Sequence, residues 1–254
     1  MRLTVIIPAY NEAAVIGETL SRLEREIRTP HEVIVVADHC SDATEERVKD
    51  FARSYPTVRL VQNFYEKGFG NALITGFEHA RTELVVPLMA DNCDDPATID
   101  RMAHLMMEKR YDAVFASRYM RGGERKGGSL VLKIFSPLVC GMLRIITGIP
   151  TWDVANSFKM YHKDTLERVG FALFGRGTDY SLWLALRVHF VGAKIVEIPT
   201  TWRGGRIPLV REPLMFKRTP GYAKAMVVAF IKTLKKIFRK TGRTSAKTEV
   251  ASKV

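Results

Sequence analysis

The sequence predicts an α/β fold in which a mostly parallel sheet carries helices on both faces. Short apolar segments rich in β-branched residues alternate along the chain with helical segments of about 10 to 15 residues, as in successive βαβ units. The crossover helices of such units cover both sides of a parallel sheet. A chain of 254 residues is long enough for one large domain of this class, with or without an appendage.

The alternation is clearest in the first half of the chain. Residues 3–7 form an apolar β-branched run that ends at Pro8, and residues 13–27 follow at helical spacing. The same order then repeats, with strands expected at 32–37, at 58–61, from Leu84 onward and at 113–116, and helices at 43–51, 72–80 and 97–109.

Each of these strands is followed by polar or glycine residues rather than by a minimal turn. In open α/β sheets the ligand lies just past the carboxyl ends of the strands, so these loops are expected to surround one crevice. Two acidic side chains in the loops also have simpler readings, because Glu12 can cap the first helix and Asp42 the second.

The fourth strand runs directly into a cluster of acids. Asp91, Asp94 and Asp95 place three carboxylates within five residues, and these repel one another unless a cation lies among them. Mg²⁺ typically takes one or two protein carboxylates together with phosphate oxygens, which makes a metal–phosphate complex the simplest occupant. The alternative is a solvated loop in which Asp95 and Pro96 start the next helix.

Residues 118–128 are basic and rich in glycine, which favours a loop with affinity for anions, and residues 130–149 are almost wholly apolar. The uninterrupted apolar part, 134–143, is too short to span a bilayer of about 30 Å. Lys133 and Arg144 lie about 20° apart on a helix, which leaves one basic edge on an apolar cylinder. A buried core helix and a helix in contact with a membrane explain this pattern equally well.

The later part of the chain adds a polar loop and strand at 151–161, a helix at 178–189 with Asp179 near its start, and a strand at 194–198. In the loop 199–206, Arg203 and Arg206 with two glycines are suited to closing over phosphates.

Residues 222–240 form the clearest amphipathic helix, with apolar residues on one arc and lysines on the other. A basic amphipathic helix suits the interface of an anionic membrane; the alternative is packing on its own domain or on a partner. Residues beyond 241 are small and polar, and we expect them to be disordered. The expected division is a catalytic domain at 1–210, a basic membrane-associating segment at 211–241 and a tail at 242–254.

The net charge of +12 lies entirely in the last part of the chain, where residues 203–254 hold 14 Lys and Arg against two acids. Such a segment attracts polyanions, but no nucleic-acid-binding motif is visible, so no nucleic acid partner is expected. Three cysteines without metal-type spacing indicate free thiols in a reducing compartment. No signal peptide precedes the first strand, which favours a cytoplasmic location.

Six motifs in order resemble those of one enzyme family. Residues 5–12 are similar to its opening strand and nucleotide loop, 38–42 to its second nucleotide loop, and 67–72 to its K-G-x-G-x-A turn. Its later signatures match Ser117-Arg118-Tyr119, Gly122-Gly123, and Asp153 followed by 157–161. Over residues 3–210 the sequence thus resembles the inverting family 2 glycosyltransferases with the GT-A (Rossmann-like) fold, and among them the polyprenyl-phosphate branch typified by dolichyl-phosphate mannosyltransferase.

The chain departs from the branch at its D-A-D-x-x-x-x-P motif. Aligned on Pro96, both aspartates of that motif are lost, one to Ala90 and the other to Asn92. Asp91 lies between these positions and Asp94 follows them, so a divalent ion held by Asp91, Asn92 and Asp94 is still expected.

The resemblance implies transfer of a sugar from a nucleoside-diphosphate sugar to a polyprenyl monophosphate, with Mg²⁺ or Mn²⁺ at Asp91 and Asp94. The acceptor is already an anionic nucleophile near neutral pH, so cations rather than a general base are required. Asp153 would orient those cations or hold a turn, and the alternative reading of Arg118 is a structural ion pair. The expected catalytic residues are Asp91, Arg118 and Arg206; the donor-binding residues Pro8, Ala9, Tyr10, Glu12, Asp38, Asp42, Lys67, Gly70, Asn71 and Asn92; and the acceptor-phosphate residues Arg118, Lys133, Ser136 and Arg203.

The same resemblance implies peripheral attachment at the cytoplasmic face of a membrane, where an anionic lipid surface is the partner. Two other classes stay open. A soluble family 2 transferase acting on a glycan hydroxyl would need a base such as Asp179 and would not need the apolar helix. A non-catalytic nucleotide-sugar-binding protein would explain Ala90 and Asn92 as lost chemistry.

Overall fold

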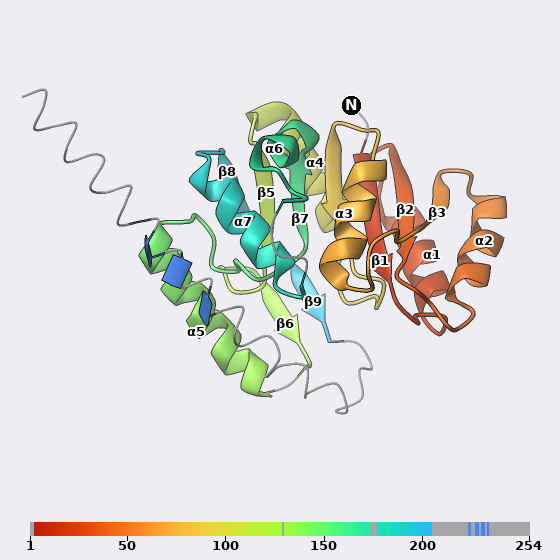
Figure 1. The fold of residues 1–254 in the computed structure, drawn as a ribbon, viewed down its shortest axis with the longest axis horizontal. Coiled ribbons are helices and arrows are strands. Elements are labelled where there is room, and N and C mark those ends of the chain that lie inside the picture. Colours follow the sequence, from red (N-terminus) through yellow and green to blue (C-terminus); the bar gives the residue numbers. More distant parts are fainter. Residues whose placement is uncertain are drawn as a thin grey trace, which may run out of the picture.

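A seven-stranded sheet forms the centre of the computed structural model (Figure 1). The structure describes residues 3–128, 130–173 and 177–204, together with residues 223, 224, 227, 228, 230, 231 and 233. The strands of this sheet are β1 (Leu3–Ala9), β2 (His31–Ala37), β3 (Val58–Gln62), β4 (Leu84–Pro87), β5 (Ala113–Ser117), β7 (Lys159–His162) and β8 (Ile195–Pro199). The helices are α1 (Ile16–Glu26), α2 (Thr44–Ser54), α3 (Phe69–His79), α4 (Thr98–Lys109), α5 (Leu130–Thr147), α6 (Lys163–Val169) and α7 (Tyr180–Phe190).

The strand order is β3-β2-β1-β4-β7-β5-β8, and β7 alone in this sheet runs antiparallel to its neighbours, β4 and β5. Strand β1 lies between β2 and β4, with Leu3 in register with His31 on one side and Leu84 on the other. The order therefore reverses between β1 and β4, which is the switch point where open α/β sheets bind ligands. The predicted mostly parallel sheet is confirmed.

Helices cover both faces of this sheet, as predicted. Side chains of α1, α2 and α4 pack with one set of strand residues, including Val5 and Val86, in one core. Side chains of α3, α5, α6 and α7 pack with the opposite set, including Ile6 and Phe115, in the other core. Figure 1 shows the C-terminal ends of β1 and β2 at the lower edge of the sheet, and α5 lies beyond that edge.

The sequence missed three short elements. Helix α6 follows β7 directly, and a two-stranded parallel ribbon joins β6 (Glu124–Lys126) to β9 (Thr201–Arg203). The ribbon strands are three residues each, too short to show a period of two in the sequence. The ribbon brings the glycine-rich loop after β5 beside the loop after β8.

Helix α5 is amphipathic rather than wholly buried. Cys140 and Leu143 lie in the core, whereas Ile134, Leu138 and Ile145 are 61%, 57% and 81% exposed. One face therefore packs on the domain, as expected of a core helix, and the other is open; contact of that face with a membrane stays a prediction. Within the described part of the chain, no helix is long and apolar enough to cross a bilayer. Most of the helix expected at 222–240 lies outside the described residues.

Candidate functional site

The loops that follow β1 and β2 are joined by polar contacts at the C-terminal edge of the sheet. Asn11 donates from Nδ2 to the Ser41 hydroxyl (3.1 Å) and accepts the Ser41 backbone N–H at Oδ1 (2.8 Å). Its positive φ of 53° belongs to the left-handed region, which asparagine tolerates better than most residues. The two predicted nucleotide loops therefore act as one structural unit.

Asp42 and Glu12 both help to hold this unit. The Asp42 carboxylate accepts the backbone N–H of Ala13 (3.0 Å) and both the N–H (3.0 Å) and the hydroxyl of Thr44 (2.5 Å). Although burial acts against it, these bonds hold the pKa of Asp42 below its usual value. The backbone N–H of Glu12 donates to Thr44 Oγ1 (2.8 Å), and its carbonyl accepts the first amides of α1. The Asp42 carboxylate thus accepts the N–H of the first residue of α2, but the N-cap position is Ala43, not Asp42.

Asp38 is buried at the end of β2 and organises the third loop. Its Oδ1 accepts Asn63 Nδ2 (2.7 Å), and both of its oxygens approach the backbone N–H of Gly68, at 3.1 and 3.0 Å. Gly68 opens α3, whose first turn contains the buried Gly70 and Asn71. Asp38 therefore links the second loop to the K-G-x-G-x-A turn.

Two residues predicted to bind the donor, Lys67 and Tyr10, are in contact with each other. The Lys67 ammonium lies 3.3 Å from the centroid of the Tyr10 ring, a cation–π contact between the first and third loops. Tyr10 is 37% exposed, whereas Pro8 and Ala9 before it are buried in β1. Beneath them, Asn71 donates to the Glu66 carbonyl (2.7 Å), while its buried Oδ1 has no hydrogen-bond partner among the described residues.

The loop between β4 and α4, residues 88–97, is called the acidic loop below. Asp91 is half-buried and accepts the backbone N–H of Cys93 (3.2 Å); Asp94 is buried and accepts that of Met89 (3.2 Å). Burial, together with the negative charge of Asp91, raises the pKa of Asp94 to about 7. The negative charge of Asp91 thus acts on the buried Asp94 carboxyl within the same loop.

The Asn92 side chain binds α1. Its side-chain oxygen accepts a hydrogen bond from Arg22 Nη1 of α1 (3.1 Å), and the same guanidinium also reaches the Asp94 carbonyl (3.2 Å) and Asp95 Oδ1 (3.4 Å). Arg22 thus anchors the acidic loop on α1. The Asn92 oxygen of the expected set already has a protein partner, and metal binding by Asp91 and Asp94 stays a prediction.

Arg118 follows β5 and makes a two-point ion pair with Asp153, called the clamp below. Nε donates to Asp153 Oδ2 (2.7 Å), Nη2 donates to Oδ1 (2.8 Å), and the Arg118 backbone N–H also donates to Oδ2 (3.0 Å). Burial alone would raise the pKa of the fully buried Asp153, but Arg118 holds that pKa below its usual range. The end of β5 lies close to the acidic loop, because the Ser117 carbonyl accepts the backbone N–H of Thr200 (3.0 Å), and the Thr200 hydroxyl is bonded to that of Thr98 at the start of α4 (3.0 Å).

The structure brings only some of the expected acceptor-phosphate residues to this place. The backbone N–H of Arg203 donates to the Cys93 carbonyl (2.8 Å), so β9 lies against the acidic loop, and the Arg203 side chain is exposed. Lys133 is exposed and Ser136 half-buried on α5, and no contact joins either to the clamp in the part of the chain described. Arg206 lies outside the described residues.

Three residues that sequence reasoning missed support the clamp and the acidic loop: Arg22, Glu197 and Lys159. Glu197 of β8 accepts the Thr151 hydroxyl (2.8 Å) and the Trp152 backbone N–H (2.5 Å), just before Asp153. Lys159 of β7 is fully buried and donates to the Val154 (3.0 Å) and Asn156 carbonyls. The sequence signal for this role is weak: it is a lysine, Lys159, at the first position of a strand that is otherwise mostly buried.

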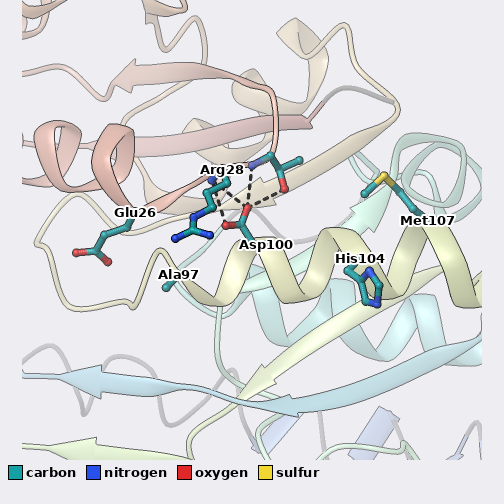
Figure 2. A pocket seen from close by; sticks show the side chains of 7 residues that line it. Glu26, Arg28, Ala97, Asp100, His104 and Met107 are labelled. Carbon is teal, nitrogen blue, oxygen red and sulfur yellow. Dashed lines mark hydrogen bonds between the residues drawn. The ribbon is translucent and has the colours of Figure 1, made fainter.

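A separate depression lies between the end of α1 and the first turns of α4 (Figure 2). Asp100 there accepts the backbone N–H groups of Arg28 (3.1 and 3.2 Å) and Thr29 (2.9 Å), so its carboxylate closes the end of α1. None of the predicted site residues lines this depression, which is bordered by Glu26, Arg28, Thr29, Ala97, Asp100, His104 and Met107.

Among the described residues, no group of three or more His, Cys, Asp or Glu side chains is arranged to hold a metal ion. Asp91 and Asp94 still suit Mg²⁺ or Mn²⁺, because these ions use few protein carboxylates when substrate phosphates complete the shell. Burial and the charge of Asp91 both raise the pKa of Asp94, and a cation at this place would oppose that shift.

Two solved structures share the fold. Glucosyl-3-phosphoglycerate synthase from Mycobacterium tuberculosis, crystallised with Mn²⁺, UDP and glucosyl-3-phosphoglycerate, gives a TM-score of 0.67 at 18% identity, covering 88% of this chain and 79% of that one. S. aureus TarS 1–349 gives 0.62 at 19% identity, covering 81% and 60%. These likenesses confirm the GT-A architecture.

The sequence comparisons add relatives of moderate identity. Dolichol-phosphate mannosyltransferase of Pyrococcus furiosus is 26% identical over 80% of this chain, which spans only 56% of the relative's length. Undecaprenyl-phosphate mannosyltransferase of Micrococcus luteus is 28% identical, covering 80% of this chain and 84% of the relative. Residues 4–170 match the family described as glycosyl transferase family 2. That match spans well over half of the chain, which therefore belongs to glycosyl transferase family 2.

Proposed function

We propose that this chain transfers a sugar from a nucleoside-diphosphate sugar to a polyprenyl monophosphate, with inversion at the anomeric carbon. The observation that carries the proposal is the clamp, in which a buried carboxylate fixes the Arg118 guanidinium at the end of β5, the edge of the sheet that also carries the acidic loop. In the proposed reaction between two anions, a metal would hold one and this arginine the other. The two curated relatives act, by their names, on dolichol phosphate and undecaprenyl phosphate, which supports the same acceptor class.

The donor would lie over the joined loops after β1, β2 and β3. Tyr10 offers an aromatic face, although Lys67 covers one side of the ring in this structure. The buried Asn71 Oδ1, without a partner among the described residues, would accept a hydrogen bond from the donor. Glu12, Asp38 and Asp42 hold these loops in place, and the remaining donor-binding candidates are Pro8, Ala9 and Gly70.

Asp91 and Asp94 are the residues that would hold Mg²⁺ or Mn²⁺ beside the donor. When bound, the ion would neutralise charge on the leaving diphosphate and orient it, the Lewis-acid and template roles of a metal. Asn92 is not proposed as a ligand because its oxygen is bonded to Arg22.

The acceptor phosphate would be drawn in by cations on the other side of the acidic loop. Arg118, fixed by Asp153, and Arg203, fixed through its backbone to Cys93, are the nearest candidates; Lys133 of α5 would act on the approaching headgroup. Holding two mutually repelling groups in attack geometry can lower the activation free energy by several kcal/mol. Positioning and electrostatics would therefore supply most of the rate. Attack opposite the leaving diphosphate would invert the configuration.

The exposed apolar face of α5 would hold the enzyme at the cytoplasmic face of an anionic membrane. Ile134, Leu138 and Ile145 lie on that face, and Arg144, stacked 4.4 Å from the Trp152 ring centroid, adds a basic edge. The basic segment at 211–241 would add a second attachment. Covering the face would place Lys133 near the lipid headgroups.

The test is a transfer assay with C55 polyprenyl phosphate in detergent or vesicles, a panel of radiolabelled nucleotide sugars, and extraction of product into organic solvent. We expect one donor to give a product that is extracted into organic solvent and is stable to alkali or labile to acid. We expect EDTA to abolish its formation. Product only on water-soluble glycans would replace the acceptor class, and no product with any donor would indicate a binding protein. Product that resists EDTA would remove the metal.

Two variants with one matched control locate the chemistry. Arg118→Gln breaks the clamp after the end of β5, and we expect at least about 100-fold lower kcat/KM for the lipid. Arg168→Gln breaks the Arg168–Asp112 ion pair (3.4 Å) at the opposite end of the same strand and should leave transfer unchanged. Asp179 accepts Trp183 Nε1 (2.8 Å), so Asp179→Asn should keep transfer to lipid phosphate but abolish any transfer to a hydroxyl.

A further inference from the structure

Lys159 is a buried lysine beneath the clamp that the proposed reaction does not use. Its residue is 0% exposed, and Nζ donates to two backbone carbonyls, that of Val154 at 3.0 Å and that of Asn156. The ammonium also lies 5.2 Å from the centroid of the Phe115 ring on the neighbouring strand β5. A lysine is almost never fully buried unless it is paired, so the burial of Lys159 needs an explanation.

The carbonyls that Lys159 binds belong to the turn that presents Asp153 to Arg118. Asp153 begins this turn, and the backbone N–H of Asn156 donates to the Asp153 carbonyl (3.3 Å). Asn156 Nδ2 donates to the Ala116 carbonyl (2.9 Å), which ties the turn to the strand that leads to Arg118. Lys159 therefore binds the backbone carbonyls of this turn, while Arg118 binds the carboxylate of Asp153.

Lys159 also contributes charge to the same place. The fully buried Asp153 is paired with Arg118 (2.7 Å), and the charges of Arg118 and of Lys159 both lower its pKa. Besides Asp153, the charged or titratable groups that act on Lys159 are Cys140 of α5, Arg118, and Glu197 of β8. Removing one partner of a buried charge set is costly, because the remaining charges lose compensation that water cannot replace.

We propose that Lys159 is a positioning residue for Arg118: it holds the 153–156 turn through two backbone carbonyls and shares the charge of Asp153, and thereby fixes the direction of the Arg118 guanidinium. Lys159 does not touch the reacting phosphates and acts through Asp153. Its consequence for catalysis depends on the proposed function, in which Arg118 binds the acceptor phosphate. The geometry of the clamp is a separate property that can be measured without substrate.

The same network predicts a pH response. Burial lowers the pKa of Lys159 to about 8, against the opposing pull of Asp153. The ammonium is therefore protonated below pH 8 and loses its charge as the pH rises through that value, while Arg118 stays charged. We expect kcat/KM for the acceptor to fall as the pH rises through about 8, because Asp153 then loses one of its two cations.

The test compares Lys159→Met and Lys159→Arg with the matched control Lys163→Met. Lys163 is a partly buried lysine of the same chain segment whose Nζ also donates to a backbone carbonyl, that of Ala80 (2.6 Å), but it has no part in the clamp. The first readout is the side-chain Nε–H resonance of Arg118 in ¹H–¹⁵N spectra, assigned by its loss in Arg118→Lys. It reports the 2.7 Å bond to Asp153 in the full chain without substrate.

We expect this resonance to shift or broaden in Lys159→Met and to stay in place in Lys163→Met. In the wild-type protein it should titrate with a midpoint near pH 8, which tests the proposal even if the methionine variant does not fold. An unchanged resonance in folded Lys159→Met, or a wild-type resonance that does not move between pH 7 and 9, would overturn the proposal.

The second readout is transfer to polyprenyl phosphate. Lys159→Met should lower kcat/KM for the acceptor by about 10- to 100-fold while KM for the donor stays within about twofold, and should lose the fall near pH 8. Lys159→Arg, which keeps the charge, should recover part of this activity and move the fall to higher pH. Equal loss for donor and acceptor would indicate general damage and overturn the proposal. If the wild-type chain transfers nothing to lipid phosphate, the proposed function fails while the spectra still decide the role of Lys159.

Discussion

The backbone N–H of Arg203 donates to the Cys93 carbonyl at 2.8 Å and so ties the end of β9 to the acidic loop. The two residues are far apart in the sequence, yet this bond holds the backbone of an exposed arginine against the loop that carries Asp91 and Asp94. The charge of the acidic loop and the cations proposed to hold the acceptor thus share one edge of the sheet.

Arg203→Ala should raise KM for polyprenyl phosphate about fivefold and leave kcat nearly unchanged. The side chain is exposed, so its attraction for a phosphate is worth about 1 kcal/mol and weakens with salt. The backbone bond to Cys93 does not involve the side chain, so the fold should be kept. Kinetics at low and high ionic strength measure the effect, which should shrink at high salt.

Arg53→Ala is the control for this variant, because Arg53 is 79% exposed on α2, away from the acidic loop. It lowers the net charge equally and should leave KM unchanged. Equal effects of the two substitutions would show that Arg203 acts only through net charge, against its assignment to the acceptor phosphate.

Asp91→Asn should weaken Mn²⁺ binding in the presence of the nucleoside diphosphate by at least about 100-fold, since even outer partners of a metal cost 10- to 100-fold. Electron paramagnetic resonance of free Mn²⁺ gives the affinity. Asp95→Asn is the neighbouring control, because Asp95 Oδ1 is paired with Arg22 (3.4 Å) on the outside of the loop. The metal assignment fails if the two variants bind Mn²⁺ alike.

Gly76→Ala should lower the free energy of unfolding by about 1 to 3 kcal/mol, because a Cβ at Gly76 would lie 2.2 Å from Ile6 Cγ2 of β1. Helix α3 packs directly on the strand that leads into the first nucleotide loop. Urea denaturation followed by circular dichroism measures the change.

Gly17→Ala in α1 is the matched substitution, since a Cβ there meets nothing within 4 Å. It should raise stability by about 0.5 kcal/mol through helix propensity alone. Opposite signs for the two glycines support the close packing of α3 on β1, and equal signs would argue against it.

The double substitution Phe135→Ser and Leu138→Ser should reduce flotation of the chain with anionic vesicles several-fold. Both side chains are more than half exposed on α5, at 58% and 57%. Loss of two apolar groups at an interface removes a few kcal/mol of membrane affinity. Sucrose-gradient flotation with phosphatidylserine vesicles measures it.

Phe64→Ser is the control for exposed apolar area, because Phe64 is 74% exposed in the loop after β3, against His79 of α3. It should float like the wild-type chain. A chain that ends before residue 221, floated alongside, separates the contribution of α5 from that of the basic C-terminal segment. Undiminished flotation of the α5 variant would remove that helix from the membrane proposal.

Much of the fold could be predicted from local patterns. The strands beginning at Leu3 and Val58 and the helices at α2 and α4 lie within a few residues of the predicted bounds. Apolar runs and helical periodicity act over about 10 to 15 residues, which is within reach of a single sequence. The placement of polar loops after these strands followed from the same patterns, because parallel strands end at one edge.

Other features depended on contacts between distant segments. The insertion of antiparallel β7 between β4 and β5 brings Asp153 to Arg118 and Lys159 beneath both, and no local pattern indicates strand order. The turn of Asn92 toward Arg22 likewise depends on how the acidic loop packs on α1.

The sequence alone determined the alternation of strands and helices, the family resemblance and the residue types available for anions and a metal. The tertiary structure decided which of these side chains meet: Asn92 is bonded to Arg22 of α1, and an arginine is fixed by a buried aspartate. The reason is physical, because hydrophobic periodicity is local, whereas a buried charge can be stabilised only by partners that the packing of remote segments supplies.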